Sequence, residues 1–326
     1  MKAQTVGIIG LGRIGASIAL ALKHSPLTLT VIGHDREMAR AHQVMEQLEA
    51  LDRVTRSLPG LAAEADILVL TVPVTELELT LRAIGEDVQP HALVLDMSQM
   101  KAKGIRWAAQ YLRQGHYVGT VPVLAADFLA DGRESIEAAR ADLFHNSVFC
   151  LMPSPETEPQ AVETAINFGR LLGATPYFVD AMEFDSLVQG VTTIPGLLAA
   201  AMFNAVHKAT GWRDMLRFAD LPFAQTTLPL QAGDEVAHLA LNDRAATLRW
   251  LDAFMEEMQQ IRRWVQEGDE ELLQAVLEKL DTERRKWLLE RSENNWVEIQ
   301  SPTYQGMSIS EQLLGRWGRR DKKDEE

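Results

Sequence analysis

The sequence is poor in cysteine and in basic residues, and each shortage excludes a class of protein. Cys150 is the single cysteine in 326 residues, so no internal disulfide can form and a reducing, cytoplasmic location is expected. Acidic residues outnumber basic residues 46 to 32, which gives a formal net charge of −14. A surface of this sign repels nucleic acid and anionic membranes, so we expect neither as a partner.

Long apolar runs and metal-ligand motifs are also missing. No uninterrupted apolar run approaches the roughly 18 residues of a membrane-spanning helix, and no signal peptide precedes the first strand-like segment. We predict no metal site. The length of the chain suggests about two domains.

Strand-like and helix-like segments alternate through the first half of the chain. The apolar, strand-like segments are residues 5–9, 27–32, 66–71, 92–96, 117–121, 147–151 and 175–179. Helical patterns lie between them at residues 37–51, 76–88, 101–113 and 159–172. This alternation predicts an α/β fold with an N-terminal Rossmann-like, doubly wound and mostly parallel sheet. Ligands of such sheets bind at the carboxyl ends of the strands.

Strand signals stop at about Met182, and the rest of the chain predicts an all-helical domain. The helical patterns are residues 184–207 with an interruption at Pro195-Gly196, residues 234–266, and residues 270–289. The second pattern carries a wide apolar stripe, which either forms intramolecular core or buries against a second copy of the chain. We therefore predict a dinucleotide-binding domain at 1–180, a helical substrate and dimerisation domain at 181–290, and a polar tail at 291–326.

The turn after the first strand carries the pattern G-x-G-x-x-G, at Gly10-Leu11-Gly12-Arg13-Ile14-Gly15. In a strand–loop–helix setting this pattern is typical of dinucleotide binding. Gly10 permits the tight turn, Gly12 lets the backbone approach a pyrophosphate, and Gly15 lets helix and strand pack closely. The start of the following helix offers free N–H groups to phosphate. We predict cofactor contacts from Gly10, Gly12, Arg13, Ile14 and Gly15, although Arg13 has the alternative of lying in solvent.

An acid follows the second predicted strand at the spacing that nicotinamide cofactors require. Asp35 lies 20 residues after Gly15, where a carboxylate binds the ribose hydroxyls of NAD and repels the 2′-phosphate of NADP. Its alternative is a loop acid that caps the next helix. Arg36 beside it leaves NADP possible. The carboxyl ends of later strands add Val72, Pro73 and Ser98 as predicted cofactor contacts.

Five further segments carry recognisable motifs: Asp96–Lys101 (D-x-x-S-x-K), Gly119–Pro122 (G-G-H-P), Glu183–Asp185 (E-H-D), Thr192–Gly196 (S-H-L-P-H) and Trp212–Arg217 (F-x-D-x-T-R). With the glycine loop and Asp35, they resemble one enzyme family, the prephenate/arogenate dehydrogenases of tyrosine biosynthesis. The resemblance spans about residues 5–290 in element order. It implies NAD as cofactor, a small carboxylate substrate, a homodimer formed through the helical domain, and substrate binding by Arg217 and at Thr193.

This chain departs from the family pattern at the catalytic positions. The catalytic histidine of the family falls on Val121, its active-site serine falls on Gln99, and the histidines of S-H-L-P-H fall on Thr193 and Gly196. The family reaction needs an acceptor for the proton of a ring hydroxyl, and valine has no lone pair to offer. The candidate catalytic residues in their place are Asp127, which follows in the next loop, Lys101 and Gln99. Lys101 has the alternative of pairing with a nearby acid, and Gln99 can hydrogen-bond a substrate but cannot act as a base.

These observations leave three functional hypotheses. The first is an NAD(P)-dependent oxidoreductase that decarboxylates prephenate or arogenate oxidatively. The second is a dehydrogenase or reductase on the same scaffold that acts on a different carboxylate. The third is a dimeric NAD-binding protein without catalysis.

Overall fold

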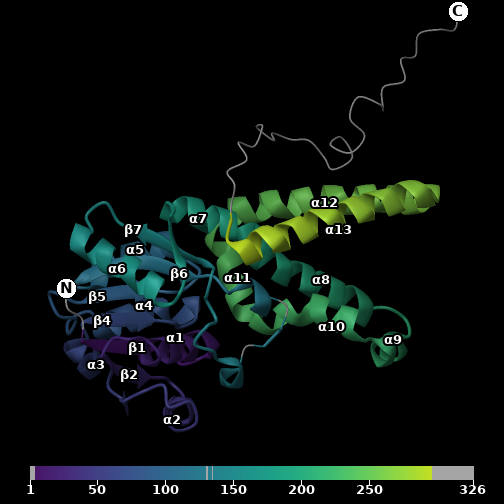
Figure 1. Ribbon diagram of the computed structural model, residues 1–326. Coiled ribbons are helices and arrows are strands. Elements are labelled where there is room, and N and C mark those ends of the chain that lie inside the picture. Colours follow the sequence, from purple (N-terminus) through teal and green to yellow (C-terminus); the bar gives the residue numbers. More distant parts are fainter. Residues whose placement is uncertain (1–3, 130, 134, 296–326) are drawn as a thin grey trace, which may run out of the picture. The chain divides into compact units, whose positions relative to one another are not determined.

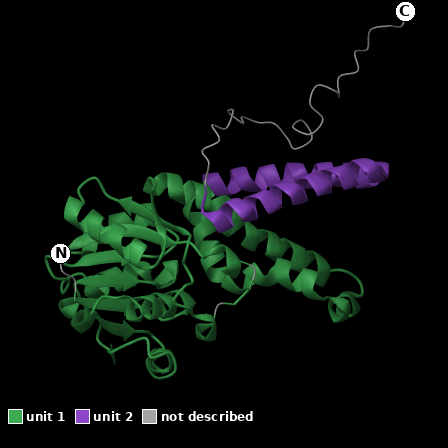
Figure 2. Cartoon of the chain, in the orientation of Figure 1, with its two compact units in different colours: residues 1–244 green, residues 245–326 purple. Residues whose placement is uncertain are grey.

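The computed structural model describes residues 4–129, 131–133 and 135–295. The chain divides into two compact units, residues 1–244 and 245–326 (Figure 2). Most of the predicted polar tail, from residue 296 onward, lies outside the described residues.

An eight-stranded sheet forms the centre of the first unit, in the order β3-β2-β1-β4-β5-β6-β7-β8 (Figure 1). The strands are β1 Thr5–Ile9, β2 Thr30–His34, β3 Arg53–Val54, β4 Ile67–Leu70, β5 Leu93–Asp96, β6 His116–Pro122, β7 Val148–Pro153 and β8 Thr175–Phe178. Every pairing is parallel except that of β6 with β7, which is antiparallel and places Val121 opposite Cys150. The predicted doubly wound, mostly parallel sheet is confirmed.

Helices cover both faces of the sheet because its central strands are apolar on both sides. All residues of β4 and β5 are buried. One face packs against α1 and α6 through residues such as Ile18 and Phe168, and the other packs against α3, α4 and α5 through residues such as Leu61 and Leu77. The helices of this part are α1 Arg13–Lys23, α2 Met38–Glu46, α3 Leu58–Glu64, α4 Val74–Ile84, α5 Lys101–Tyr111 and α6 Pro159–Leu171.

The rest of the first unit is helical, as predicted. Its helices are α7 Ala181–Val188, α8 Ile194–His207, α9 Trp212–Phe218, α10 Leu221–Thr227 and α11 Gly233–Asn242. A π-helical turn, Gln189–Thr193, joins α7 to α8 without a break. The predicted interruption at Pro195-Gly196 is wrong, because the helical backbone continues through Pro195, which lies at the start of α8 directly after the π-helical turn.

The continuous helical segment Ala181–His207 also corrects the expectation about apolar runs. The segment has 27 residues and contains an 18-residue window of mean hydropathy 1.5, so it is long and apolar enough to cross a membrane by length and composition alone. Core helices pass the same test, and one end of this segment packs on the sheet domain, where buried Asp185 accepts hydrogen bonds from α5.

The second unit consists of a helical pair, α12 Arg244–Glu267 and α13 Glu270–Glu293, of which α12 begins one residue before the unit boundary. Gly268 between them adopts a positive φ of 68°, and Asp269 caps α13 by accepting a hydrogen bond from the N–H of Leu272 at 2.9 Å. The predicted single helix over residues 234–266 is wrong, because the backbone leaves the helical region at Asp243 (φ −122°, ψ 78°). The predicted helix from residue 270 is confirmed.

Candidate cofactor and substrate site

The three glycines of the loop after β1 have different surroundings: two lie against neighbouring backbone, and one borders open space. Gly10 has a φ of 93°, and a Cβ there would lie 2.7 Å from the carbonyl oxygen of Thr71. A Cβ on Gly15 would lie 2.1 Å from the carbonyl oxygen of Gly10, so both positions require glycine for the fold itself. A Cβ on Gly12 would meet nothing within 4 Å. Open space therefore lies at the start of α1, where its free N–H groups favour a phosphate.

Asp35 lies beside this loop, directly after β2. Its side chain is 4% exposed, and its Oδ2 accepts a hydrogen bond from the N–H of Leu11 at 2.7 Å. Oδ1 accepts one from the N–H of Glu37 at 2.8 Å, and the Arg40 guanidinium lies 3.3 Å away. Asp35 thus ties the end of β2 to the glycine loop. Its carboxylate also lies at the position from which an acid binds ribose hydroxyls.

The two arginines of the predicted cofactor site have intramolecular partners. The Arg13 guanidinium is 7% exposed and forms a bidentate pair with Asp131, with Nη2 2.6 Å and Nη1 2.9 Å from the carboxylate oxygens. Arg36 forms an ion pair with Glu76 at the surface. Neither guanidinium stands free toward the glycine loop.

The carboxyl ends of β4 and β5 form the next part of this edge. Val72 is partly exposed and Pro73 is exposed between β4 and α4. Ser98 is 5% exposed, and its N–H and hydroxyl both donate to the carboxylate of Asp96, at 2.8 and 3.2 Å. Gln99 beside it is half-buried. The turn from β5 to α5 is therefore organised around Asp96.

Lys101 lies inside this turn and not at its surface. Its side chain is 0% exposed, and its Nζ donates to the backbone oxygen of Asp96 at 2.7 Å and to the Asp96 carboxylate at 3.1 Å. The hydroxyl of Tyr117 donates to the same carboxylate at 2.7 Å. Burial lowers the pKa of Lys101 and raises the pKa of Tyr117 well above its ordinary value. The alternative that Lys101 pairs with a nearby acid is confirmed, and the D-x-x-S-x-K segment contains three members of this network, Asp96, Ser98 and Lys101.

Asp185 is a second buried acid that sequence reasoning did not assign to the site. Its carboxylate accepts hydrogen bonds from the N–H groups of Lys101 at 2.7 Å and of Ala102 at 3.0 Å, and so caps α5 from the neighbouring helix α7. Burial raises the pKa of Asp185, although these hydrogen bonds oppose the shift. Asp185 is the last residue of the E-F-D segment at 183–185, so this segment is the sequence feature that could have indicated it.

Val121, at the family's histidine position, lies in an apolar cluster. It is 7% exposed and packs with Cys150 and Met152 from β7, and Phe184 from α7 lies against the same cluster. The surroundings of this side chain are apolar, so the substitution of valine for histidine is matched by its neighbours.

The remaining predicted residues lie in different environments. Asp127 is exposed in a short 3-10 turn, Ala126–Phe128, after β6. Thr193 is 0% exposed in the π-helical turn, and its Oγ1 has no hydrogen-bond partner among the described residues. Arg217 is 74% exposed on α9, which packs against α8, and it pairs with Asp214 at 3.3 Å. Figure 1 shows α9 at the end of α8 away from the sheet, so the first unit does not bring Arg217 to the glycine loop.

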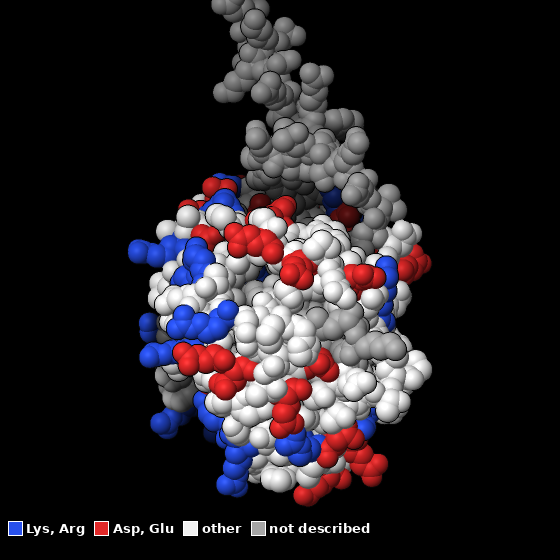
Figure 3. Space-filling view, turned by 90° about the vertical axis from the view of Figure 1, so that its left-hand side faces the viewer, with Lys and Arg blue, Asp and Glu red and all other residues white. Residues whose placement is uncertain are grey.

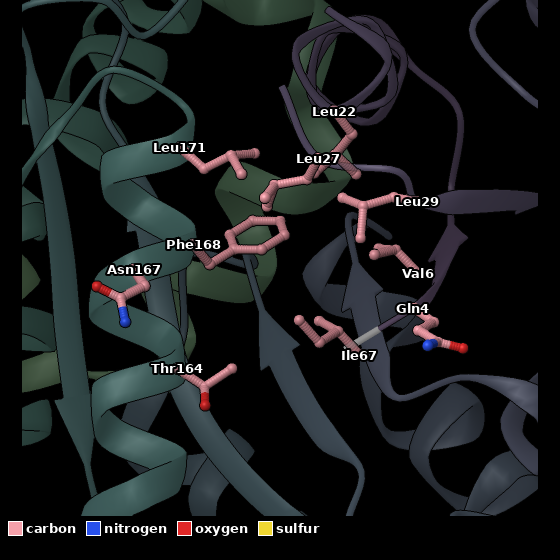
Figure 4. A pocket seen from close by; sticks show the side chains of 10 residues that line it. All are labelled: Gln4, Val6, Leu22, Leu27, Leu29, Ile67, Thr164, Asn167, Phe168 and Leu171. Atoms are coloured by element: carbon pink, nitrogen blue, oxygen red, sulfur yellow. The ribbon is translucent and has the colours of Figure 1, made fainter. Parts of the chain in front are cut away.

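Two cavities lie away from the glycine loop. One, of about 380 Å³, opens at the amino ends of β1 and β4, the edge opposite the loop, where Phe168 and Leu171 of α6 point toward Leu27 and Leu29 (Figure 4). The other, of about 290 Å³, lies at the first turns of α4 and α5 and includes His238 of α11. The lining of neither includes a glycine of the loop.

A parallel, doubly wound sheet with an open glycine loop and an acid after its second strand defines a dinucleotide-binding protein of the dehydrogenase class. Residues 18–177 match the family model described as the prephenate dehydrogenase nucleotide-binding domain. The family model, the curated relatives and the solved structures all support the prephenate/arogenate dehydrogenase family, which is one of NAD-dependent oxidoreductases.

Individual relatives agree with this assignment. The prephenate dehydrogenase of Bacillus subtilis is 25% identical over 280 residues, which are 83% of this chain and 72% of that protein. The structure of prephenate dehydrogenase from A. aeolicus, in complex with hydroxyphenyl propionate and NAD+, has a TM-score of 0.74 at 19% identity and covers 88% of this chain and 99% of its own. Synechocystis arogenate dehydrogenase has a TM-score of 0.65 at 21% identity, with coverages of 87% and 100%. These two structures share the fold of this chain.

Proposed function

We propose that this chain oxidises prephenate or arogenate with NAD as the hydride acceptor. The observation that carries the proposal is the glycine loop, which is open at Gly12 and closed by Asp35, in a chain of this family. The preference for NAD over NADP follows from the buried Asp35, because its carboxylate accepts hydrogen bonds from the ribose hydroxyls of NAD and repels the 2′-phosphate of NADP.

The proposed reaction converts a ring carbinol into a phenol. The hydride leaves the ring carbon that bears the hydroxyl, and the hydroxyl loses its proton, which gives a ring ketone. The bond from the ring to the carboxylate then breaks with release of CO₂, its electron pair makes the ring aromatic, and the resulting phenolate oxygen takes a proton back to give the phenol. NAD, when bound, supplies the hydride acceptor. The protein must hold the ring against the cofactor and accept the hydroxyl proton.

We assign to Asp127 the role of accepting the hydroxyl proton of the substrate. Among the carboxylates, Asp127 is the nearest in sequence to the position that carries histidine in the family. The half-buried Gln99 and the buried, unpartnered Oγ1 of Thr193 are the proposed hydrogen-bond partners of the substrate. Arg217 is the proposed partner of a substrate carboxylate, through a bidentate pair. Because α9 holds it away from the glycine loop within the first unit, this role requires that the second copy in the homodimer proposed below bring it to the site. Lys101, which was a candidate for proton transfer, is assigned instead to positioning the β5–α5 turn, because its side chain is fully buried and its Nζ donates to Asp96.

The test is formation of reduced nicotinamide, followed by absorbance, with NAD and either prephenate or arogenate. Asp127→Asn should lower kcat by roughly 10²- to 10⁴-fold, the usual contribution of a general base. Asp142→Asn is the matched control, since Asp142 is an exposed acid of the same β6–β7 connection that pairs with Arg140. Equal activity of Asp127→Asn and the control would reject Asp127 as the base.

The apolar surroundings of Val121 favour a second candidate, an NAD-binding protein that lacks this turnover. The cluster of Val121, Cys150 and Met152 offers no proton acceptor at the family's catalytic position. Tight NAD binding without turnover of prephenate, arogenate or a panel of other hydroxy and keto acids would support this candidate. If the protein turned over only another carboxylate substrate with NAD, the assignment of prephenate or arogenate would be wrong, and the assignment of NAD as cofactor would stand.

We also propose that the protein acts as a cytoplasmic homodimer through its helical part. Exposed apolar side chains on α12, such as Leu248 and Met255, at 57% and 51% exposure, support the homodimer. The cytoplasmic location rests on the single cysteine.

A further inference from the structure

Arg13 lies inside the glycine loop, yet its guanidinium is committed to a distant part of the chain. Nε donates to the carbonyl of Ala138 at 3.2 Å, Nη1 donates to Asp131 and to the carbonyl of Arg133, and Nη2 donates to Asp131. Four of the five N–H groups of a guanidinium are thereby used. One N–H remains for any other acceptor, which leaves no bidentate contact for a phosphate.

The segment that Arg13 holds is attached to α1 at further points. We call the described residues 131–133 and 135–140 the α1 strap. The backbone N–H of Arg140 donates to the Oγ of Ser17 at 3.0 Å, and Ser17 is 0% exposed. Ile136 and Ala138 are 8% and 6% exposed, and Ile136 belongs to the core cluster that includes Ile18 of α1. The strap therefore packs along the first turns of the helix whose N-terminus faces the open space at Gly12.

We propose that Arg13 is a positioning residue that holds the α1 strap beside the phosphate site, and that it is not a phosphate ligand. The strap forms a wall of the site, while backbone N–H groups of the loop and of α1 bind the pyrophosphate. The inference rests on the cofactor part of the proposed function. It predicts that Arg13 and Asp131 act on NAD binding as one unit.

The experiment is a double-mutant cycle on the NAD dissociation constant, measured by calorimetry with Arg13→Met, Asp131→Asn and the double variant. Each single variant should weaken NAD binding about tenfold, which corresponds to about 1.4 kcal/mol. The double variant should bind no more weakly than the single variants, because both remove the same pair. Arg140→Met with Asp142→Asn is the control, since that pair lies at the strap's end, is half exposed, and should change the dissociation constant less than twofold.

A phosphate ligand would give a different pattern. Arg13→Met would weaken NAD binding, while Asp131→Asn would leave it unchanged or tighten it by releasing the guanidinium, and this result would overturn the proposal. Unchanged binding in both single variants would overturn it as well.

Hydrogen exchange of residues 131–145 provides a readout that needs no cofactor. Both single variants should exchange faster than the wild type in this segment, while exchange in β4 and β5 stays unchanged and so reports an intact fold. Exchange equal to the wild type would contradict the positioning role. If the wild type bound no NAD, both the proposed function and the proposed effect of the strap on cofactor binding would be rejected. Faster exchange of residues 131–145 in the Arg13 and Asp131 variants would still show that Arg13 holds the strap.

Discussion

At the scale of single residues, Gly12 is the loop position at which a substitution can test cofactor binding without disturbing the fold. Its φ of −67° suits any residue, and an added Cβ meets no neighbour within 4 Å. Gly15 contrasts with it, because a Cβ there collides with the backbone of Gly10. The fold therefore does not require glycine at position 12, and the open space there is accessible to a ligand.

We expect Gly12→Ala to bind NAD at least about tenfold more weakly while its thermal unfolding midpoint stays within about 2 °C of the wild type, since the methyl group occupies the pyrophosphate approach. Gly15→Ala should lower both NAD affinity and the unfolding midpoint. Calorimetric titration and a thermal melt measure the two quantities. Unimpaired NAD binding by Gly12→Ala would place the phosphates elsewhere.

A second prediction at this scale concerns cofactor choice. Asp35→Ser removes the acid that repels a 2′-phosphate, while Arg36 and Arg40 stay nearby. We expect NAD binding to weaken and the ratio of NADP to NAD affinity to rise by about one to two orders of magnitude. Arg40→Met in the Asp35→Ser background should reverse the gain. An unchanged ratio of the two affinities would remove Asp35 from the ribose site.

At the scale of elements, the N-terminus of α5 depends on an acid from another helix. Asp185 of α7 accepts from two N–H groups of the first turn of α5, a task that a local capping residue usually performs. Loss of this cap in Asp185→Ala should cost about 0.5–2 kcal/mol of unfolding free energy.

The pH dependence of this cap has a definite sign. Burial raises the pKa of Asp185 above its ordinary 3.8, so the folded state binds the proton more tightly than the unfolded state. The contribution of Asp185 to stability therefore falls as the pH rises from about 3.8 through the raised pKa. Asp185→Asn should lack this fall, and urea unfolding of both proteins between pH 4 and about pH 7 tests it. Parallel stability profiles would show that Asp185 does not titrate in this way.

Some elements of the fold could be predicted from the sequence and others could not. The strands were predictable because each is a short, continuous apolar run, and β3 was missed because Arg53–Val54 is only two residues long. The π-helical turn before Pro195 and the break at Asp243 have no local signature of this kind. The glycine loop and Asp35 were predictable because their residues lie close together in sequence.

The rest of the site joins residues that are far apart in the chain. Arg13 and Asp131 are separated by 118 positions, and Lys101 and Asp185 by 84. Both pairings depend on the finished sheet, so no local pattern contained them. The single-helix interpretation of residues 234–266 failed for a related reason, since apolar periodicity continues on both sides of Asp243.

At the scale of the whole molecule, the proposed dimer explains the apolar surface of the helices. Met255 and Met258 of α12 are 51% and 48% exposed. On the face of the molecule drawn in Figure 3, by contrast, acidic and basic side chains share the surface.

We expect the wild type to sediment as a dimer at micromolar concentration and Met255→Glu/Met258→Glu to sediment as a monomer, because two charges cannot be buried in an apolar interface without partners. Leu79→Glu is the control, since Leu79 is 67% exposed on α4, outside the helical part. A monomeric wild type would refute the dimer proposal.

The most direct test of the central claim is the rate of NADH formation when the wild-type protein is incubated with NAD and either prephenate or arogenate, with Gly12→Ala run alongside. We predict turnover with one of these substrates that Gly12→Ala reduces through a higher KM for NAD. NAD binding without turnover of either substrate, under conditions where another member of the family is active, would contradict the claim.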